Sequence, residues 1–158
     1  MEQGDNIIVS TSIGNLGLHI VDESLYAIRY LPEDASPCRH VNGLAAEVLK
    51  QINAYLKDPK WQFDIPYVLQ GTPFQKRIWQ KLTTIPNGKT CFYSDIARDL
   101  DTGPRAVGGA CRNNPIPIIV PCHRVLAKSG IGGYDGDWGG GKVYIKSRLL
   151  RHEGVVGA

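Results

Sequence analysis

The feature that most constrains the fold is a change in hydrophobic pattern near residue 70. Before it, short runs rich in β-branched and aromatic residues alternate with turn sequences, which is typical of strands. The runs are residues 7–9, 16–21 and 25–30, and the turns are Gly14-Asn15 and Asp22-Glu23. Apolar residues then recur at helical spacing from Leu44 to Leu56, so one amphipathic helix is expected to pack on a small antiparallel sheet.

Residues after 70 predict short helices instead. Thr72-Pro73-Phe74-Gln75 combines an N-cap threonine, a proline at the first helical position and a glutamine three residues after the cap. Pro86-Asn87-Gly88 is expected to end this helix. Next come a short helix around residues 94–100, a turn at Thr102-Gly103-Pro104, a helix over 105–112 and a last helix ending at His152-Glu153-Gly154. Two short helices joined by a glycine-containing turn form a helix-turn-helix pattern.

The helix expected over residues 105–112 is poor in large side chains. Ala106, Gly108, Gly109 and Ala110 are all small, although glycine inside a helix costs about 1 kcal/mol relative to alanine. This indicates close approach by another surface, with Arg105 projecting at the start of the helix. Tight packing within the protein is the alternative.

The balance of charged residues also changes near residue 70. Residues 1–70 carry 5 Lys and Arg against 9 Asp and Glu, a balance of −4, and residues 71–158 carry 13 against 6, a balance of +7. The net charge of +3 therefore conceals a basic half, which suits contact with a polyanion. A solvated basic face is the alternative.

Composition excludes several other classes of protein. The chain is 42% hydrophobic and 21% charged, as in globular proteins, and it has neither an apolar run that could span a bilayer nor a basic-then-apolar leader. A cytoplasmic protein without a membrane partner is expected. The four cysteines show no disulfide spacing and no CxxC, so we expect reduced thiols. Cys38, His40 and His19 are too loosely spaced to indicate more than an incidental zinc shell, and no metal is expected.

Pro121-Cys122-His123-Arg124-Val125 places a thiol directly beside an imidazole, after the apolar residues 116–120. A cysteine in an apolar run is more often an inert core residue. A cysteine delivered by a rigid segment and followed by a histidine is also a candidate nucleophile, because the thiolate is the reactive form.

Several short motifs in one fixed order carry a family resemblance. They are Gly71-Thr72-Pro73-Phe74-Gln75, Ile85-Pro86-Asn87-Gly88-Lys89-Thr90, Arg105-Ala106-Val107-Gly108, Asn114-Pro115, Pro121-Cys122-His123-Arg124-Val125, Gly133-Tyr134 and Leu149-Leu150-Arg151-His152-Glu153-Gly154. With these motifs the chain resembles the O6-alkylguanine-DNA alkyltransferases (methylated-DNA–protein-cysteine methyltransferases). The resemblance is dense over about residues 71–154 and covers the first lobe in layout, including residues 11–16.

The resemblance implies two domains: an RNase H-like α/β domain over residues 1–70, and a mostly α-helical, winged-helix-like domain over 71–158 for DNA binding and catalysis. Its helix-turn-helix would enter the minor groove, where small side chains allow close approach. The implied activity is direct-reversal DNA repair by a suicide alkyltransferase. An alkyl group of O6-alkylguanine, and of O4-alkylthymine, would pass once and irreversibly to Cys122. The implied protein is a monomer that acts on double-stranded DNA carrying alkylated bases, without a cofactor.

The resemblance also assigns catalytic roles. Cys122 would attack the alkyl carbon, and His123, oriented by Glu153, would act on the thiol through a bridging water. Asn114 would support this network and its turn. Tyr93 would help to rotate the lesion out of the duplex and would donate a hydrogen bond to the departing guanine.

Other residues would contact DNA or the lesion. Arg105 would fill the gap left by the extruded nucleotide, and Pro104, Ala106, Gly108 and Tyr93 complete the expected DNA contacts. Tyr134, Asp135 and Lys146 are the expected substrate-binding residues. Arg124 is expected to brace the active-site turn through an ion pair.

The chain departs from the family pattern at three places. The turn Asp101-Thr102-Gly103-Pro104 is short, and Phe92 replaces a small polar residue before Tyr93. The glycine-rich, acidic loop over residues 135–142 is longer than usual, which leaves the preferred size of the alkyl group open.

Three other functions remain open on the residues alone. A non-catalytic lesion binder would lack the reactive cysteine. A Cys/His hydrolase would need a third orienting residue and an oxyanion hole, and would turn over repeatedly. A helix-turn-helix regulator would dimerise on spaced half-sites.

Overall fold

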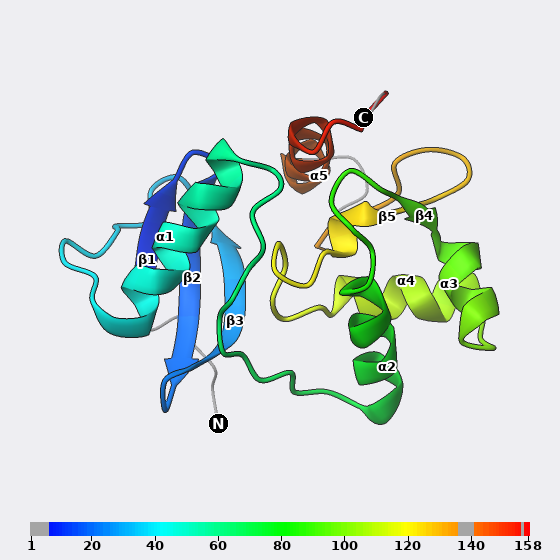
Figure 1. The fold of residues 1–158 in the computed structure, drawn as a ribbon, viewed down its shortest axis with the longest axis horizontal. Coiled ribbons are helices and arrows are strands. Elements are labelled where there is room, and N and C mark those ends of the chain that lie inside the picture. The colour runs from blue at the N-terminus through cyan, green and yellow to red at the C-terminus, as the bar shows by residue number, and fades with distance from the viewer. Residues whose placement is uncertain (1–6, 136–140, 156) are drawn as a thin grey trace. The chain divides into compact units, whose positions relative to one another are not determined.

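The structure is a computed structural model that describes residues 7–135, 141–155 and 157–158 (Figure 1). The chain forms two compact units, unit 1 (Met1–Gln70) and unit 2 (Gly71–Ala158). The fold is mixed α/β, with a small antiparallel sheet in unit 1 and most of the helices in unit 2. No helix in the described part of the chain is long and apolar enough to cross a membrane.

Unit 1 is a three-stranded antiparallel sheet with one helix packed on it (Figure 1). The strands β1 (Ile7–Thr11), β2 (Gly14–Val21) and β3 (Ser24–Leu31) pair in chain order, and the helix is α1 (Gly43–Lys57). Val48, Ile52 and Tyr55 of α1 are buried, as are Leu16 and Leu18 of β2. The strand and helix patterns of the sequence are thus confirmed.

Of the two turns predicted between the strands of unit 1, one is confirmed and one is wrong. Asp22 and Glu23 join β2 to β3 with φ of 49° and 61°, the two positive values that a type I′ hairpin turn requires. Gly14-Asn15 is not a turn, because β2 begins at Gly14, which pairs with Thr11. The Thr11 hydroxyl accepts a hydrogen bond from the Ile13 amide at 3.2 Å and donates one to the Gly14 carbonyl at 2.8 Å, and so closes the turn two residues earlier.

The segment after α1 is fastened to unit 1 without forming a helix. The Gln51 side chain binds the backbone of Asp64 through both its amide nitrogen (2.9 Å) and its oxygen (2.8 Å). Leu25 of β3 donates to the Pro66 carbonyl and accepts from the Val68 amide. These bonds extend unit 1 to the residues that precede Gly71.

Unit 2 contains short helices and one two-stranded sheet. Its elements are α2 (Pro73–Leu82), β4 (Cys91–Phe92), α3 (Tyr93–Asp99), α4 (Pro104–Arg112), the 3-10 turn η1 (Cys122–Arg124), β5 (Val125–Leu126) and α5 (Gly141–His152). The capping box predicted at Thr72 and Gln75 is present, with both hydrogen bonds at 3.0 Å. Helix α2 ends at Leu82, four residues before Pro86, because the hydroxyls of Thr83 and Thr84 bind carbonyls of its last turn at 2.6 Å.

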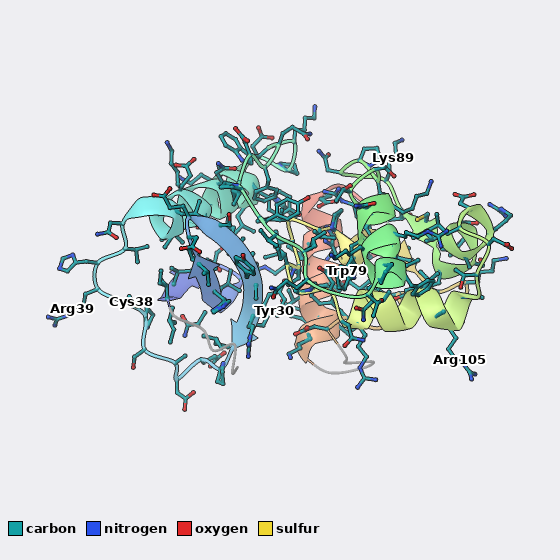
Figure 2. All side chains as sticks on the ribbon, turned by 90° about the horizontal axis from the view of Figure 1, so that it is seen from below. Tyr30, Cys38, Arg39, Trp79, Lys89 and Arg105 are labelled. Carbon is teal, nitrogen blue, oxygen red and sulfur yellow. The ribbon has the colours of Figure 1, made fainter. Side chains whose placement is uncertain are left out.

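Trp79 fixes the position of α4 against α2. Its side chain is buried, and its indole Nε1 donates a 2.8 Å hydrogen bond to the Ala110 carbonyl (Figure 2). Arg105, in the first turn of α4, is by contrast exposed and projects from that helix (Figure 2). Helix α4 is therefore held from one side while its first turn faces solvent.

The parallel pairing of β4 with β5 was not expected from the sequence. Cys91 lies opposite Val125, and Phe92 lies opposite Leu126. Tyr93 follows β4 directly, and the Cys122–Arg124 turn precedes β5 directly. This short sheet therefore brings Tyr93 close to the Cys122–Arg124 turn, called the reactive turn below because it carries the candidate nucleophile, although Tyr93 and Cys122 are 29 positions apart in sequence.

Candidate active site

Cys122 lies at the start of a tightly turned segment. Pro121 has φ of −83° and ψ of 65°, and the Cys122 amide donates a 2.8 Å hydrogen bond to the Val120 carbonyl, which together describe an inverse γ-turn. Cys122 is 5% exposed and lines a cavity. The thiol is therefore screened from bulk water but faces a space that a ligand can enter.

Asn114 holds the segment that leads to Cys122. Its Nδ2 donates to the Val120 carbonyl at 2.8 Å, and its Oδ1 accepts from the Ile116 amide at 3.0 Å. Between these points Ile118 has φ of 76°, a value that β-branched residues rarely adopt. The buried amide of Asn114 thus stabilises an otherwise unfavourable loop.

A buried carboxylate joins the two residues that follow Cys122. Glu153 Oε2 lies 2.8 Å from His123 Nε2, and Arg124 contacts both carboxylate oxygens, through Nε at 2.9 Å and Nη2 at 3.0 Å. Arg124 Nη1 also donates to the Ile85 carbonyl, and the Gly88 amide donates to Glu153 Oε1. The ion pair predicted for Arg124 is present, and its partner is Glu153.

Burial determines the resting protonation states of the thiol and the imidazole. Burial raises the pKa of the Cys122 thiol to about 11, although the Asn114 side-chain hydrogen bond and the Lys146 charge act in the opposite direction. Burial also lowers the pKa of the His123 imidazole, although Glu153 opposes this shift. At neutral pH the site therefore holds a protonated thiol and a neutral imidazole. Among the described residues no group hydrogen-bonds the buried His123 Nδ1.

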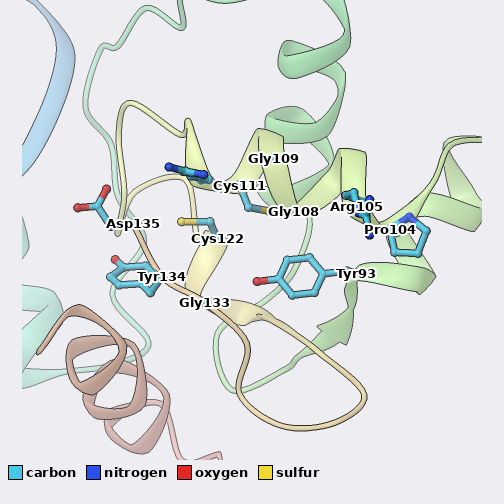
Figure 3. A pocket seen from close by; sticks show the side chains of 11 residues that line it. Tyr93, Pro104, Arg105, Gly108, Gly109, Cys111, Cys122, Gly133, Tyr134 and Asp135 are labelled. Atoms are coloured by element: carbon cyan, nitrogen blue, oxygen red, sulfur yellow. The ribbon is translucent and has the colours of Figure 1, made fainter. Parts of the chain in front are cut away.

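The cavity beside Cys122 has a volume of about 450 Å³ (Figure 3). Its walls come from α3, α4, the reactive turn and the loop before α5. The lining residues are Tyr93, Pro104, Arg105, Gly108, Gly109, Cys111, Arg112, Cys122, Gly133, Tyr134 and Asp135. The sequence-predicted residues of this set therefore meet in one place, with the Tyr93 hydroxyl pointing into the cavity (Figure 3).

Lys146 contacts the site through hydrogen bonds to backbone carbonyls. It is fully buried, and its Nζ donates to the Val125 carbonyl at 2.7 Å and to the Gly133 carbonyl at 2.9 Å. It also lies 5.7 Å from the centre of the Tyr93 ring. Burial lowers the pKa of Lys146 to about 8, although the nearby Cys122 and Cys111 thiols oppose this shift. Lys146 thus ties the loop before Tyr134 to the strand that follows the reactive turn.

Tyr93 is enclosed by the loop that ends at Tyr134. Gly132 has φ of 80°, and a Cβ there would lie 3.1 Å from ring carbon Cε2 of Tyr93 and 3.3 Å from the Ala127 amide. Burial raises the pKa of the Tyr93 hydroxyl, and the Cys111 and Cys122 thiols add to this shift. The Tyr93 phenol is therefore a protonated hydrogen-bond donor.

The outward face of α4 carries little side-chain bulk. Pro104, Arg105 and Ala106 are exposed, and a Cβ added at Gly108 would meet nothing within 4 Å. Of these residues, Pro104, Arg105 and Gly108 line the cavity. Three of the four sequence-predicted DNA contacts on α4 thus border the cavity of Cys122, and Ala106 does not.

Four lining residues were not predicted as site residues: Gly109, Cys111, Arg112 and Gly133. Cys111 lies seven residues after Pro104 and three after Gly108 on α4, a spacing that places all three on one helical face. This spacing was a usable signal for Cys111, and the sequence analysis did not use it.

Two other predictions concern the long loop and the possible metal ligands. Asp135 forms a 2.9 Å ion pair with Lys142, while residues 136–140 of the loop lie outside the described residues. In the described part of the chain no group of three His, Cys, Asp or Glu side chains could hold a metal ion. The candidate ligand Cys38 is exposed.

Comparison with known proteins places this arrangement in a family. Residues 73–155 match the family model for the DNA binding domain of 6-O-methylguanine DNA methyltransferase. The chain belongs to the 6-O-methylguanine DNA methyltransferase family. A relative from Archaeoglobus fulgidus, named methylated-DNA–protein-cysteine methyltransferase, is 43% identical over 113 residues, which are 70% of this chain and 76% of the relative. A relative of the same name from Mycobacterium tuberculosis is 40% identical over 152 residues, 92% of this chain and 89% of the relative.

Solved structures of the 6-O-methylguanine DNA methyltransferase family have the same fold. The Mycobacterium tuberculosis OGT, crystallised in complex with DNA, superposes with a TM-score of 0.78 at 38% identity and covers 92% of this chain and 90% of its own. An O6-methylguanine DNA methyltransferase from Methanococcus jannaschii superposes with a TM-score of 0.69 at 30% identity, covering 93% and 92%. The sequence-based expectation of this family is confirmed.

Proposed function

We propose that the protein repairs alkylated DNA by a single, irreversible transfer of an alkyl group to Cys122. The substrate is double-stranded DNA that carries O6-alkylguanine or O4-alkylthymine. The observation that carries this proposal is the buried Cys122 thiol, which faces a cavity lined by Gly108 and Gly109 of α4. His123, the next residue in the chain, is hydrogen-bonded to Glu153. The names of the relatives support the same activity.

The chemistry begins with a proton transfer. A bridging water carries the Cys122 proton to Nδ1 of the neutral His123, and Glu153 stabilises the imidazolium through its 2.8 Å contact with Nε2. Because the resting thiol is protonated, this base is needed to form the thiolate.

The thiolate then displaces guanine from the alkyl carbon. A carbon–sulfur bond forms as the bond from carbon to O6 breaks, and the electron pair of that bond moves onto the guanine. Tyr93 donates a hydrogen bond to the guanine as negative charge builds there, and the proton released by the thiol ultimately neutralises it. The product is a thioether, which offers no easily broken bond, so each chain reacts once.

Access to the lesion requires that the base leave the duplex. In our proposal α3 and α4 form a helix-turn-helix of a winged-helix-like domain, and α4 enters the minor groove through Ala106 and Gly108. Arg105 fills the gap in the stack, and the cavity between Tyr93 and Tyr134 receives the everted base. The small sheet and helix of unit 1 fit an RNase H-like domain.

We also propose that the protein acts as a monomer in the cytoplasm and needs no cofactor. The four cysteines are free thiols, which suits a reducing compartment. The proton and charge movements described above use side chains of unit 2 and one bridging water.

The decisive experiment is incubation with duplex DNA that carries radiolabelled O6-methylguanine. The proposal predicts one label per chain, located on Cys122 by peptide mapping. Cys122→Ser should lose transfer and keep DNA binding. Continuous release of label would indicate a hydrolase. Binding to the lesion without transfer of label would indicate a lesion binder, and lesion-independent binding to spaced half-sites would indicate a regulator.

A further inference from the structure

The turn over residues 86–89 lies between α2 and β4 and brings a backbone amide to the active site. The Lys89 amide donates a 3.2 Å hydrogen bond to the Pro86 carbonyl. Gly88, the third residue of the turn, has φ of 78°, which any residue with a side chain adopts only under strain. A Cβ at Gly88 would also lie 3.1 Å from the Glu153 backbone carbonyl oxygen. This turn therefore requires glycine at position 88.

The amide of Gly88 contacts the carboxylate that orients the imidazole. It donates a 3.2 Å hydrogen bond to Glu153 Oε1, which also accepts from Arg124 Nε at 2.9 Å. The second oxygen, Oε2, lies 2.8 Å from His123 Nε2. Arg124 Nη1 donates to the carbonyl of Ile85, the residue just before the turn, at 2.6 Å. The turn and Arg124 thus hold Oε1 together, and the imidazole meets Oε2.

The charge on Glu153 determines which nitrogen of His123 carries the proton. An ionised carboxylate accepts from an Nε2–H group, which leaves a bare Nδ1 that can act as a base. A protonated carboxyl group would instead donate to Nε2, and the imidazole proton would lie on Nδ1. Both side chains are fully buried, and burial favours the neutral form of a carboxyl group, whereas hydrogen bonds from N–H groups favour the ionised form. The Gly88 amide therefore opposes the effect of burial.

We propose that Gly88 is a positioning residue for the transfer reaction. Its amide helps to keep Glu153 ionised and holds Oε2 against Nε2, so that His123 keeps a bare Nδ1 for the Cys122 proton. This inference rests on the proposed function and adds a residue to its proton pathway. Gly88 acts through Glu153 and is not one of the residues that line the cavity.

The test removes the Gly88 N–H group and keeps the shape of glycine. Glycolic acid, incorporated at position 88 by nonsense suppression, replaces the amide between Asn87 and Gly88 with an ester, which has no hydrogen to donate. The same replacement at Gly43 is the matched control. Gly43 also has a positive φ, of 58°, and it is the first residue of α1, where an N–H group has no acceptor within the helix.

Single-turnover transfer from a duplex carrying O6-methylguanine is the first readout. The Gly88 ester should react about tenfold or more slowly than the wild type and the Gly43 ester, because a hydrogen bond to a charged group is worth about ten- to a hundredfold in an equilibrium constant. Its affinity for the duplex should be unchanged, since the lost hydrogen bond lies inside the protein.

The second readout is the tautomer of His123, which a merely structural role of Gly88 would leave unchanged. It is measured by ¹⁵N NMR of protein labelled at histidine, and the His123 signals are those that a His123→Phe chain lacks. The wild type and the Gly43 ester should show a protonated Nε2 and a bare Nδ1. In the Gly88 ester the signals should shift toward the opposite tautomer.

The outcomes separate the inference from the function on which it rests. A Gly88 ester that reacts at the wild-type rate overturns the inference, as does a slower one whose His123 signals are unchanged. A wild type that transfers no methyl group overturns the proposed function, whereas the NMR comparison needs no substrate and still decides whether Gly88 sets the tautomer. If thermal melting shows that the Gly88 ester is partly unfolded, Gly88→Ala decides, with Gly43→Ala as its control. This change displaces the N–H group without removing it, and unchanged His123 signals in the folded chain would overturn the inference.

Discussion

The Glu153 carboxylate lies 2.8 Å from His123 Nε2, so the residue that follows α5 is joined to the turn that carries the reactive thiol. Both side chains are completely buried. A buried carboxylate needs a hydrogen-bonded partner of opposite charge, and Arg124 supplies it with two nitrogens at 2.9 and 3.0 Å. The Glu153 carboxylate thus orients the His123 imidazole and also stabilises the fold.

Glu153→Gln should lower both the rate of transfer and the stability. We expect the single-turnover rate to fall by about 10²- to 10⁴-fold, because the imidazolium loses its stabilising charge. The free energy of unfolding should fall by about 3–5 kcal/mol, because the Arg124 guanidinium loses its buried partner. Denaturant unfolding and transfer assays check the two effects. Glu47→Gln, at an exposed position of α1, is the matched control; a Glu153→Gln chain that behaved like it would contradict the assigned role.

The reactivity of Cys122 in the free protein should keep rising with pH well above neutrality. Burial raises the pKa of this thiol to about 11, and only the thiolate reacts with a small alkylating reagent such as iodoacetamide. The logarithm of the rate at Cys122, read by peptide mapping, should therefore rise about one unit per pH unit from about pH 6 to about pH 9.5. A plateau near neutral pH would instead mean a preformed thiolate.

Tyr93→Phe should slow transfer without weakening DNA binding. The ring remains, so the cavity keeps its wall, but the hydroxyl that faces the cavity is lost (Figure 3). We expect a decrease of about 10²-fold in the single-turnover rate, the usual cost of removing one donor from a developing negative charge. Tyr144→Phe, on an exposed tyrosine of α5, is the control. Unchanged transfer by Tyr93→Phe would remove the hydroxyl from the mechanism.

Arg105→Ala should impair reaction with duplex DNA but spare reaction with a free base. Extrusion of a base costs a few kcal/mol of unstacking and unpairing, so losing the residue that we propose fills the gap should slow transfer from duplex DNA by about tenfold or more. Transfer from free O6-benzylguanine should be unaffected, because no duplex has to open. Arg98→Ala, at an exposed arginine of α3, controls for the loss of positive charge; equal effects of both changes would indicate a purely electrostatic role.

Trp79→Phe should destabilise unit 2. The change removes the 2.8 Å hydrogen bond to the Ala110 carbonyl and leaves space in a buried site, which together should cost about 1–3 kcal/mol. Urea unfolding followed by circular dichroism measures this loss. Trp61→Phe, where the tryptophan is 38% exposed, should change stability by less than about 0.5 kcal/mol. Similar effects of the two changes would contradict the role given to Trp79.

Local pattern predicted the helices and the long strands, because each has a periodic apolar face or a defined cap. The strands β4 and β5 have two residues each, too few to show any period. Their pairing depends on contacts between distant segments, so the closeness of Tyr93 and Cys122 became visible only in the folded chain.

The site residues were found through motif order rather than through local physics. Glu153 and Lys146 are charged residues on or next to a helix, for which burial is a poor expectation from the sequence. Their burial follows from partners remote in sequence: Arg124 for Glu153, and the carbonyls of Val125 and Gly133 for Lys146. Cys111 was missed because small-residue patterns do not distinguish a cavity wall from tight packing.

Helix α4 has two adjacent glycines, Gly108 and Gly109, and in isolation such a segment would spend most of its time unwound. In the folded protein the indole of Trp79 anchors its Ala110 carbonyl from behind. The conformational entropy of α4 is thus lost when the protein folds rather than when a ligand arrives. If α4 contacts the duplex as we propose, the duplex meets a preorganised surface, and binding does not have to include the ordering of this helix.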